Sequence, residues 1–137
     1  MKMTGVKEHL RKLRAIRDIE SAAVQALLDA GELVRMEALE SIREGAIRGI
    51  GHIASRPGEA PNADTGELEL GIDVRLRSSD KAVEVVSLAE YSAELEFGSS
   101  RIAERPFMRP AAAKHKNRVV LLMVAAVNDR IGRAKKY

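Results

Sequence analysis

The sequence has no cysteine and no tryptophan, and only two phenylalanines and two tyrosines among its 137 residues. Without cysteine the chain forms neither a disulfide framework nor a catalytic thiolate, which fits a reducing compartment. Histidine is scarce too, and His9, His52 and His115 do not have the spacing of a zinc site. The chain also lacks a glycine-rich phosphate loop and a serine in a hydrolase motif. We therefore expect a protein that is not an enzyme and that binds neither a metal ion nor another cofactor.

Long apolar runs are absent as well. The longest, Val119 to Val127, has nine residues, whereas a membrane helix needs about 18. No apolar run of signal-peptide length follows the first five residues. These absences predict that the protein does not enter a membrane.

What the chain does contain is typical of a folded protein. Hydrophobic residues make up 45% and charged residues 31%, which is the balance of a globular chain rather than a disordered one. A chain of this length buries a sizeable core as one domain, so we expect a single domain over residues 1–137. The formal net charge of +3 is mildly basic and is less than the dense positive charge of a dedicated DNA-binding protein.

The charges are unevenly distributed along the chain. Basic residues gather at the two ends, and an acidic segment lies between them. Separate acidic and basic surfaces allow copies of one chain to pair head to tail, which is the kind of contact that closes rings. The plainer interpretation is that these charges are solvated faces. The acidic residues are Glu84, Glu90, Glu94 and Glu96, and the basic ones include Lys2, Lys7, Arg11, Lys12, Arg14 and Arg17, then Arg101, Arg105, Arg109, Lys114, Lys116, Arg118, Arg130, Arg133, Lys135 and Lys136.

Helical spacing of apolar residues predicts two long helices and a shorter one. Residues 1–17 form an amphipathic helix or arm that either docks on the core or binds a membrane surface or nucleic acid. Residues 18–50 read as one long helix, in which Gly31 either permits a close approach or marks a break. Residues 109–135 form a closing helix that is apolar on more than one face, so it lies between two elements or faces another subunit.

Alternating apolar residues predict a small sheet between the long helices. Residues 55–66 are rich in turn-forming residues and form a loop, and residues 67–98 contain the strands. Leu68 to Arg77 alternates five times, residues 81–88 return as its hairpin partner, and Leu95 to Phe97 adds a third strand. We predict an α+β fold, with an antiparallel sheet of three to four strands packed on one face by the N-terminal and C-terminal helices.

The scarce aromatic residues are concentrated around residues 91–110, which marks a packing centre. Residues 99–106 form a loop that is either pinned by an aromatic plug or presented to a partner. The candidate partner contacts are Arg101, Arg105, Glu94 and Glu96. The expected structural anchors are Tyr91, Phe97, Gly98, Pro106, Phe107 and Pro110, the last because proline suits the first turn of a helix.

The same stretch resembles a known family. Tyr91-Ser92, Glu96-Phe97-Gly98 and the seven residues Arg105–Ala111, with an upstream match at Pro61 and Asp64–Leu68, are similar to the signature of the neck or tail-completion proteins of long-tailed bacteriophages. The resemblance covers roughly residues 57–112. Gly98-Ser99 departs from the usual Gly-Thr, and residues 69–72 lack the common basic residue followed by Ser-Ile.

The resemblance implies a structural virion protein of a tailed phage or prophage, which assembles as a homo-oligomeric ring at the head–tail junction after synthesis in the bacterial cytoplasm. Its implied partners are other copies of itself, the head-closure or connector and tail proteins, and DNA passing through the ring. The implied roles are contact with a neighbour for Arg101 and Arg105, and an internal plug for Phe107. The alternative is a small basic nucleic-acid-binding protein that uses residues 1–17 or the C-terminal tail, although no aromatic residues interleave its basic positions.

Overall fold

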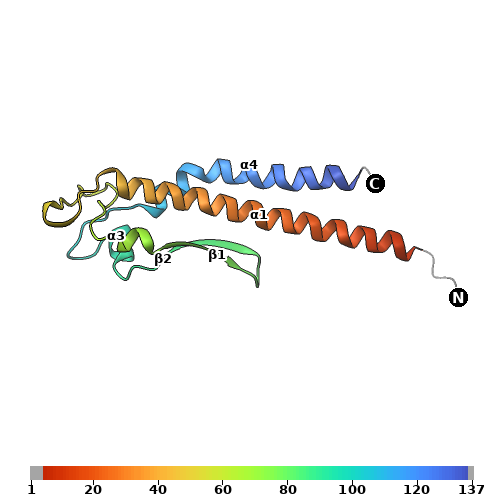
Figure 1. The fold of residues 1–137 in the computed structure, drawn as a ribbon, viewed down its shortest axis with the longest axis horizontal. Helices are drawn as coiled ribbons and strands as arrows, with labels where there is room; N and C mark the ends of the chain where they lie inside the picture. Colours follow the sequence, from red (N-terminus) through yellow and green to blue (C-terminus); the bar gives the residue numbers. More distant parts are fainter. Residues whose placement is uncertain (1–4, 136–137) are drawn as a thin grey trace.

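The structure is a computed structural model that describes residues 5–135. It has the predicted mixture of long helices and antiparallel strands, but the sheet is smaller than expected. Residues 1–4 of the predicted N-terminal arm and Lys136 lie outside the described residues. The elements in chain order are α1 (Val6–Glu44), the 3₁₀ helix η1 (Gly49–Gly51), α2 (Glu67–Leu70), β1 (Ile72–Arg77), β2 (Ala82–Ser87), α3 (Ser92–Phe97) and α4 (Met108–Ala134) (Figure 1).

Helix α1 is unbroken, so the predicted short helix over 1–17 and long helix over 18–50 are one element that ends earlier than expected. Gly31 does not interrupt it. A Cβ atom at Gly31 would lie 2.8 Å from Val74 Cγ1 and 3.0 Å from Val83 Cγ1, so the glycine lets the hairpin approach α1 closely. The close-approach interpretation is confirmed and the break is excluded. The helix ends at Glu44, and the next residue, Gly45, is its C-cap.

The two strands form an antiparallel hairpin that lies along α1. Leu76 pairs with Val83 and Val74 with Val85, so these four side chains share the face turned toward the helix. The observed β2 matches the predicted strand over 81–88 with slightly shorter ends. Glu20 of α1 forms an ion pair with Lys81 in the hairpin turn, which marks how far the hairpin reaches along α1.

The predicted strand from Leu68 begins too early. Residues 67–70 form the single helical turn α2, and only residues 72–77 are extended. Leu68 is buried while Leu70 is 89% exposed, whereas a strand would have put both on the same face. The reason lies in tertiary contacts of this turn. The Glu69 carboxylate is buried and forms ion pairs with Arg43 at the end of α1 and with Arg48 in the loop after it. A strand through Leu68 and Leu70 would turn the Glu69 side chain toward solvent.

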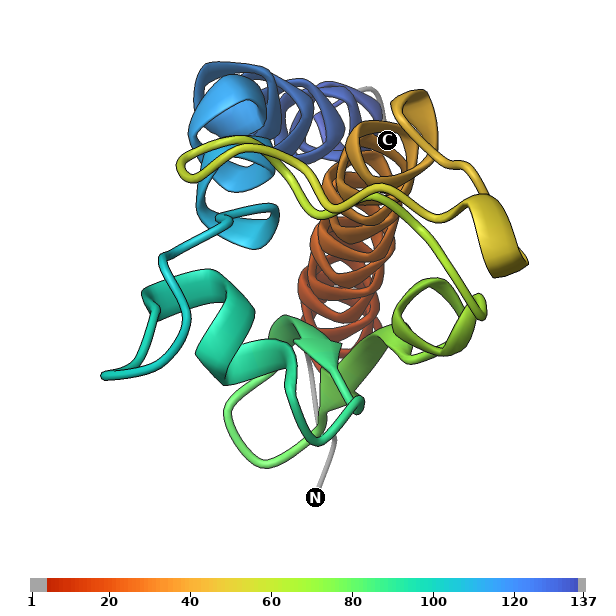
Figure 2. The ribbon, with the colours of Figure 1, turned by 90° about the vertical axis from the view of Figure 1, so that its left-hand side faces the viewer.

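The predicted third strand is also wrong, because residues 92–97 form helix α3 and the sheet has two strands among the described residues. The expectation that both long helices cover the sheet needs a second correction. Helix α1 lies between the hairpin and α4, and α4 runs antiparallel along the other side of α1 (Figures 1 and 2). Glu37 of α1 links the two helices through Lys114 and His115.

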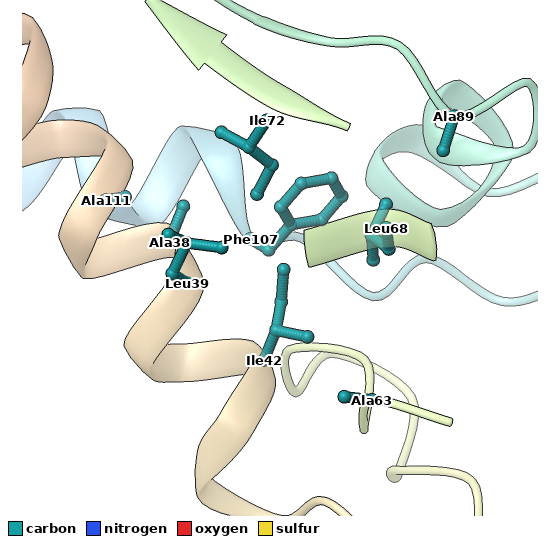
Figure 3. Packing of buried hydrophobic residues seen from close by; sticks show 9 residues of the cluster. All are labelled: Ala38, Leu39, Ile42, Ala63, Leu68, Ile72, Ala89, Phe107 and Ala111. Atoms are coloured by element: carbon teal, nitrogen blue, oxygen red, sulfur yellow. The ribbon is translucent and has the colours of Figure 1, made fainter. Parts of the chain in front are cut away.

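The hydrophobic core lies at one end of the molecule, where the C-terminal half of α1 meets α2, the start of β1 and the start of α4. The Phe107 ring, 1% exposed, lies between Ile72, Leu68 and Ile42 (Figure 3). Away from this end, few residues of the long helices are fully buried. Residues 6–14 of α1 are all exposed, and α4 has no fully buried residue after Ala111 within the described range.

Candidate interaction surface

The residues predicted to anchor the aromatic centre meet at the start of α4. Phe107 is the N-cap residue of this helix and supplies no capping side chain. Glu96 of α3 takes that role: Oε2 accepts hydrogen bonds from the backbone N–H groups of Phe107 and Met108, both at 2.9 Å, and Oε1 accepts from the Arg109 N–H at 2.8 Å. Since the first N–H groups of a helix have no intrahelical acceptor, one carboxylate satisfies three of them.

Glu96 is therefore an internal capping residue rather than the surface contact that we expected. It is 5% exposed, and Arg109 also donates to it through Nε at 3.0 Å. Burial by itself raises the pKa of the Glu96 carboxyl, but the three backbone donors and Arg109 together outweigh burial and hold the pKa below its ordinary value. The positive end of the α4 dipole favours the same charged state.

Phe97 occupies the opposite position from the one predicted. It is 67% exposed, so it is not a buried anchor, and its ring lies under the Arg109 guanidinium, 5.0 Å from the ring centroid. Residues two apart share a face in a strand but lie about 200° apart on a helix. In α3 this geometry turns Leu95 and Glu96 inward and Glu94 and Phe97 outward. Glu94 is thus the exposed member of the predicted acidic pair.

The loop over 99–106 is held to the body of the protein at several points. The Arg105 N–H donates to the Leu95 carbonyl at 2.6 Å, and the Gly58 N–H donates to the Glu104 carbonyl at 2.9 Å. Gly98 begins the loop with φ 73°, and a Cβ there would lie 3.0 Å from the Glu104 nitrogen, so glycine is needed both for conformation and for space. The loop is accordingly pinned along most of its length.

The two arginines of this loop differ in their surroundings. The half-buried Arg105 side chain donates to the carbonyl oxygens of Ser55 and Ala103, so its hydrogen bonds stay within the chain. Arg101 is exposed, and its guanidinium has no hydrogen bond or ion pair to another residue in the range 5–135. Of the two predicted arginine contacts, Arg101 is the one that the structure leaves available to a partner.

The remaining predicted anchors lie on either side of the core. Pro106 is half-buried just before the N-cap, and Pro110 stands in the first turn of α4, where a missing N–H costs nothing. Tyr91 is 38% exposed and borders a cleft of about 530 Å³ between the loop after α1 and the segment 91–105. Burial first, and then the nearby charges of Glu67 and Asp64, raise the pKa of the Tyr91 hydroxyl.

A larger exposed surface lies on α4. The helix has a second apolar stripe on the side turned away from α1, with residues spaced alternately four and three apart. Val120 is 55% exposed and Val124 51% exposed, and no element among the described residues covers them. The sequence predicted a closing helix that lies between two elements or faces another subunit, and within residues 5–135 α1 is the one long element beside α4. The stripe consists of Ala113, Val120, Val124, Val127 and Ile131, and the polar Asn117 interrupts it.

The first turns of α1 carry a further exposed apolar stripe, which we call the N-terminal stripe: Val6, Leu10, Leu13 and Ile16. The N-terminal stripe continues the face of α1 that the hairpin covers further along. Seven-residue intervals connect Leu10 on this face to Arg17, Val24 and Gly31. Helix α1 extends past the end of α4 here (Figure 1). Residues 1–17 were predicted either to dock on the core or to bind a membrane surface or nucleic acid, and residues 6–16 do not dock on the core.

No helix within residues 5–135 is long and apolar enough to cross a membrane. The same residues contain no cluster of three or more histidine and acidic side chains placed to hold a metal ion. A comparison of the chain with protein-family models, curated proteins and solved structures found no match.

Sequence reasoning missed the Glu96 cap and the exposure of Phe97, since both depend on α3 being helical. The available signal was the helix start itself. Phe107 to Pro110 offers no capping side chain, so the first N–H groups of the helix needed acceptors from elsewhere.

Proposed function

We propose that the protein is a structural subunit of a tailed phage or prophage, a neck or tail-completion adaptor that assembles as a ring at the head–tail junction. Its partners in this proposal are copies of itself, the head-closure or connector protein and the tail protein, and DNA passes through the ring. It would be present in the bacterial cytoplasm during assembly and in the virion afterwards. A structural role is proposed, not a catalytic one.

The observation that carries the proposal is the apolar helix surface that lacks an intramolecular partner. Apolar side chains in the first turns of α1, from Val6 to Ile16, and in the middle of α4, from Val120 to Val124, are about half exposed. A monomeric protein rarely exposes continuous apolar stripes of this kind, because burial of apolar area is the main gain of folding and association. Two such stripes on one chain suit a subunit with several neighbours.

The resemblance of residues 57–112 to the neck and tail-completion proteins supports the same proposal from the sequence. The residues that carry the resemblance include Gly98 and Phe107, which here set the loop conformation and fill the core. The pinned loop over 99–106 holds Arg101 at the surface in a fixed place, and a fixed position favours a specific contact since little freedom is lost on binding.

The test is electron microscopy of particles from a phage or prophage in which this gene is deleted. The proposal expects filled heads and finished tails that do not join, and joining restored by the wild-type gene in trans. A V120E/V124E variant that folds normally should fail to restore joining, whereas the matched exposed substitution Arg118→Glu should restore it. Normal joined virions from the deletion strain would refute the proposal.

A second candidate function is nucleic-acid binding by the first turns of α1. Residues 5–17 carry five Lys or Arg residues against one acid, and residues 5–14 are all exposed. Phosphate contacts release counterions, so the affinity for duplex DNA should fall steeply as salt rises. Fluorescence anisotropy across a salt series checks this. An affinity that is weak and nearly independent of salt would exclude the candidate.

A further inference from the structure

Three isoleucines are exposed on the loop that follows α1. Ile47 is 47% exposed, Ile50 is 111% exposed and Ile53 is 63% exposed, so the central side chain of the three is in full contact with solvent. A single apolar residue on a surface is ordinary, whereas three within seven residues of one loop mark a contact surface. We call residues 47–53 the isoleucine loop. The gold segment that contains its 3₁₀ helix η1 stands at the edge of the molecule (Figure 2).

Hydrogen bonds hold the isoleucine loop in this position. The Gly49 N–H donates to Asp64 Oδ1 at 3.1 Å, and the His52 N–H closes the turn by donating to the Gly49 carbonyl at 2.9 Å. The side-chain amide of Asn62 donates to the Ile53 carbonyl at 2.8 Å. These bonds fix the loop with its central isoleucine turned outward, so binding of that side chain would cost little conformational entropy.

The cleft of about 530 Å³ that Tyr91 borders lies next to this loop. His52, Asn62 and Asp64 line the cleft and also take part in the hydrogen bonds that hold the loop. Ile50 is not a lining residue, so the loop does not fill the cleft of its own chain. A cleft of this volume holds a drug-sized ligand, and it therefore admits the apolar side chains of an inserted loop. Its apolar lining consists of Ala54, Pro61, Ala63, Leu68, Leu95 and Ile102.

The loop and the cleft also differ in the sign of their charge. Residues 45–56 contain two arginines and no acidic residue. Of these, the Arg56 guanidinium has no hydrogen bond or ion pair to another residue in the range 5–135. The cleft has the exposed acids Asp64 and Glu67, and the Glu67 carboxylate is likewise unpaired within the described residues. The two surfaces therefore match in apolar character and in charge.

We propose that the isoleucine loop of one copy inserts into the cleft of a second copy of this chain, with Ile50 as the side chain that enters it. This proposal rests on the ring-forming function proposed above and names the surfaces that join neighbouring subunits. Each copy carries one loop and one cleft, so the contact repeats from copy to copy, as a closed ring requires. Burial of Ile50 supplies most of the affinity, and the charges orient the partner.

The amount of apolar surface covered favours a second copy over other occupants. A small apolar ligand would fill the cleft and leave the isoleucines exposed. A lipid surface would take up the isoleucines and leave the cleft unfilled. A second copy covers the loop of one chain and the cleft of the other in a single contact, which removes more apolar area from water than either alternative.

The first experiment is cysteine crosslinking, which has no background because the chain contains no cysteine. A Gly51→Cys protein is mixed with a Thr65→Cys protein, and a short bismaleimide is added. Gly51 adjoins Ile50 and has room for a side chain, since the nearest atom to an added Cβ lies 3.5 Å away, and Thr65 is an exposed residue of the cleft. The expected product is the mixed dimer, in excess over the dimers of either protein alone. A product consisting mainly of Gly51→Cys dimers would overturn the proposal, and so would the absence of any crosslinked dimer.

The second experiment changes the loop and the cleft separately in the crosslinking proteins. Ile50→Asp in the Gly51→Cys protein should abolish the mixed dimer. Ile50→Ala should raise the concentration needed for half-maximal crosslinking roughly 50-fold, because three buried carbon groups are lost. Ala54→Arg in the Thr65→Cys protein should also abolish the mixed dimer, since this exposed alanine lines the cleft and a long side chain there obstructs it.

The matched control is Met36→Asp, which replaces an apolar side chain that is 55% exposed on α1 and should leave the mixed dimer unchanged. All of these substitutions are at exposed positions, so each variant should melt like wild type in far-UV circular dichroism. An equal loss of the mixed dimer in the control would overturn the assignment. An undiminished dimer with Ile50→Asp would overturn it as well.

Further measurements separate this inference from the alternatives and from the ring function. Phosphatidylcholine vesicles should not reduce the mixed dimer, and binding of the loop to the vesicles in place of the dimer would overturn the proposal. If the wild-type gene restores head–tail joining and Ile50→Asp restores it equally, the surfaces are wrong but the neck function stands. If the mixed dimer forms as expected but the deletion strain assembles normally, the contact between loop and cleft stands and the neck function fails.

Discussion

The contact between Glu96 and the start of α4 supplies the sharpest stability prediction. Glu96→Ala removes one carboxylate that accepts from three backbone N–H groups and from Arg109. A hydrogen bond to a charged group contributes about 1.5–3 kcal/mol, and the loss of a helix cap costs about 1 kcal/mol. Water reaches the exposed Arg109 side chain, so the total loss of stability is less than the sum of these contributions. We expect a loss of about 3–5 kcal/mol in the free energy of unfolding.

Glu96→Gln separates the charge from the shape of this contact. The amide keeps one carbonyl acceptor, so the loss at neutral pH should be smaller, about 1–3 kcal/mol. The folded pKa of Glu96 lies below its ordinary value of 4.5. A carboxylate whose pKa falls on folding stabilises the protein fully above the unfolded pKa, and that contribution is lost as the pH falls through the folded pKa. The difference between wild type and Glu96→Gln should therefore shrink as the pH falls below 4.5.

The assay is urea unfolding followed by far-UV circular dichroism, which suits a chain that is rich in helix and has no tryptophan. Glu94→Ala is the matched control, since Glu94 is exposed two residues away and should change stability by no more than about 0.5 kcal/mol. The reasoning is refuted if Glu96→Ala and Glu94→Ala unfold alike. It is equally refuted if the effect of Glu96→Gln is the same at neutral and acid pH.

Three other comparisons of variants test the packing and the surface. Phe107→Ala should lose about 3–5 kcal/mol in thermal or urea unfolding and Phe97→Ala less than about 1 kcal/mol, because only the first ring is buried; equal losses would contradict the helical α3. Gly31→Ala places a methyl group against the hairpin, which should lower the free energy of unfolding by about 1–3 kcal/mol, partly offset by about 1 kcal/mol of helix propensity. Gly132→Ala has open space around it and should be neutral or stabilising in the same melts. Arg101→Glu should melt like wild type yet fail to restore head–tail joining, and a melt as damaged as that of Phe107→Ala would show that Arg101 is structural.

The sequence alone was enough to predict the two long helices, because each repeats its apolar residues over many turns. The α1 pattern even placed Gly31 on the buried stripe, where the structure puts the hairpin valines. The hairpin was predictable for the same reason, since the alternation of β1 fixes the face that this strand buries, whereas β2 has apolar residues on both faces and its buried face follows from pairing with β1. Periodicity works here because the signal accumulates with length.

Short segments gave no such signal, and tertiary contacts decided them. Leu68 to Leu70 continues the alternation of β1, but pairing of Glu69 with Arg43 and Arg48 accompanies a helical turn instead. Glu94 to Phe97 alternates over only four residues, too few to distinguish a strand from a helix.

The exposure of the candidate surfaces depends on the same kind of tertiary contacts. Periodicity identified the apolar stripes of α1 and α4, but only the packing of the chain revealed that the hairpin stops near Glu20 and that α4 has one covered side. The helical turn of α3 buried the Glu96 carboxylate at the α4 N-terminus and exposed Phe97 beside Glu94. Sequence periodicity determined which faces are apolar, and tertiary packing decided which of them remain uncovered, because burial depends on neighbours that are distant in the chain.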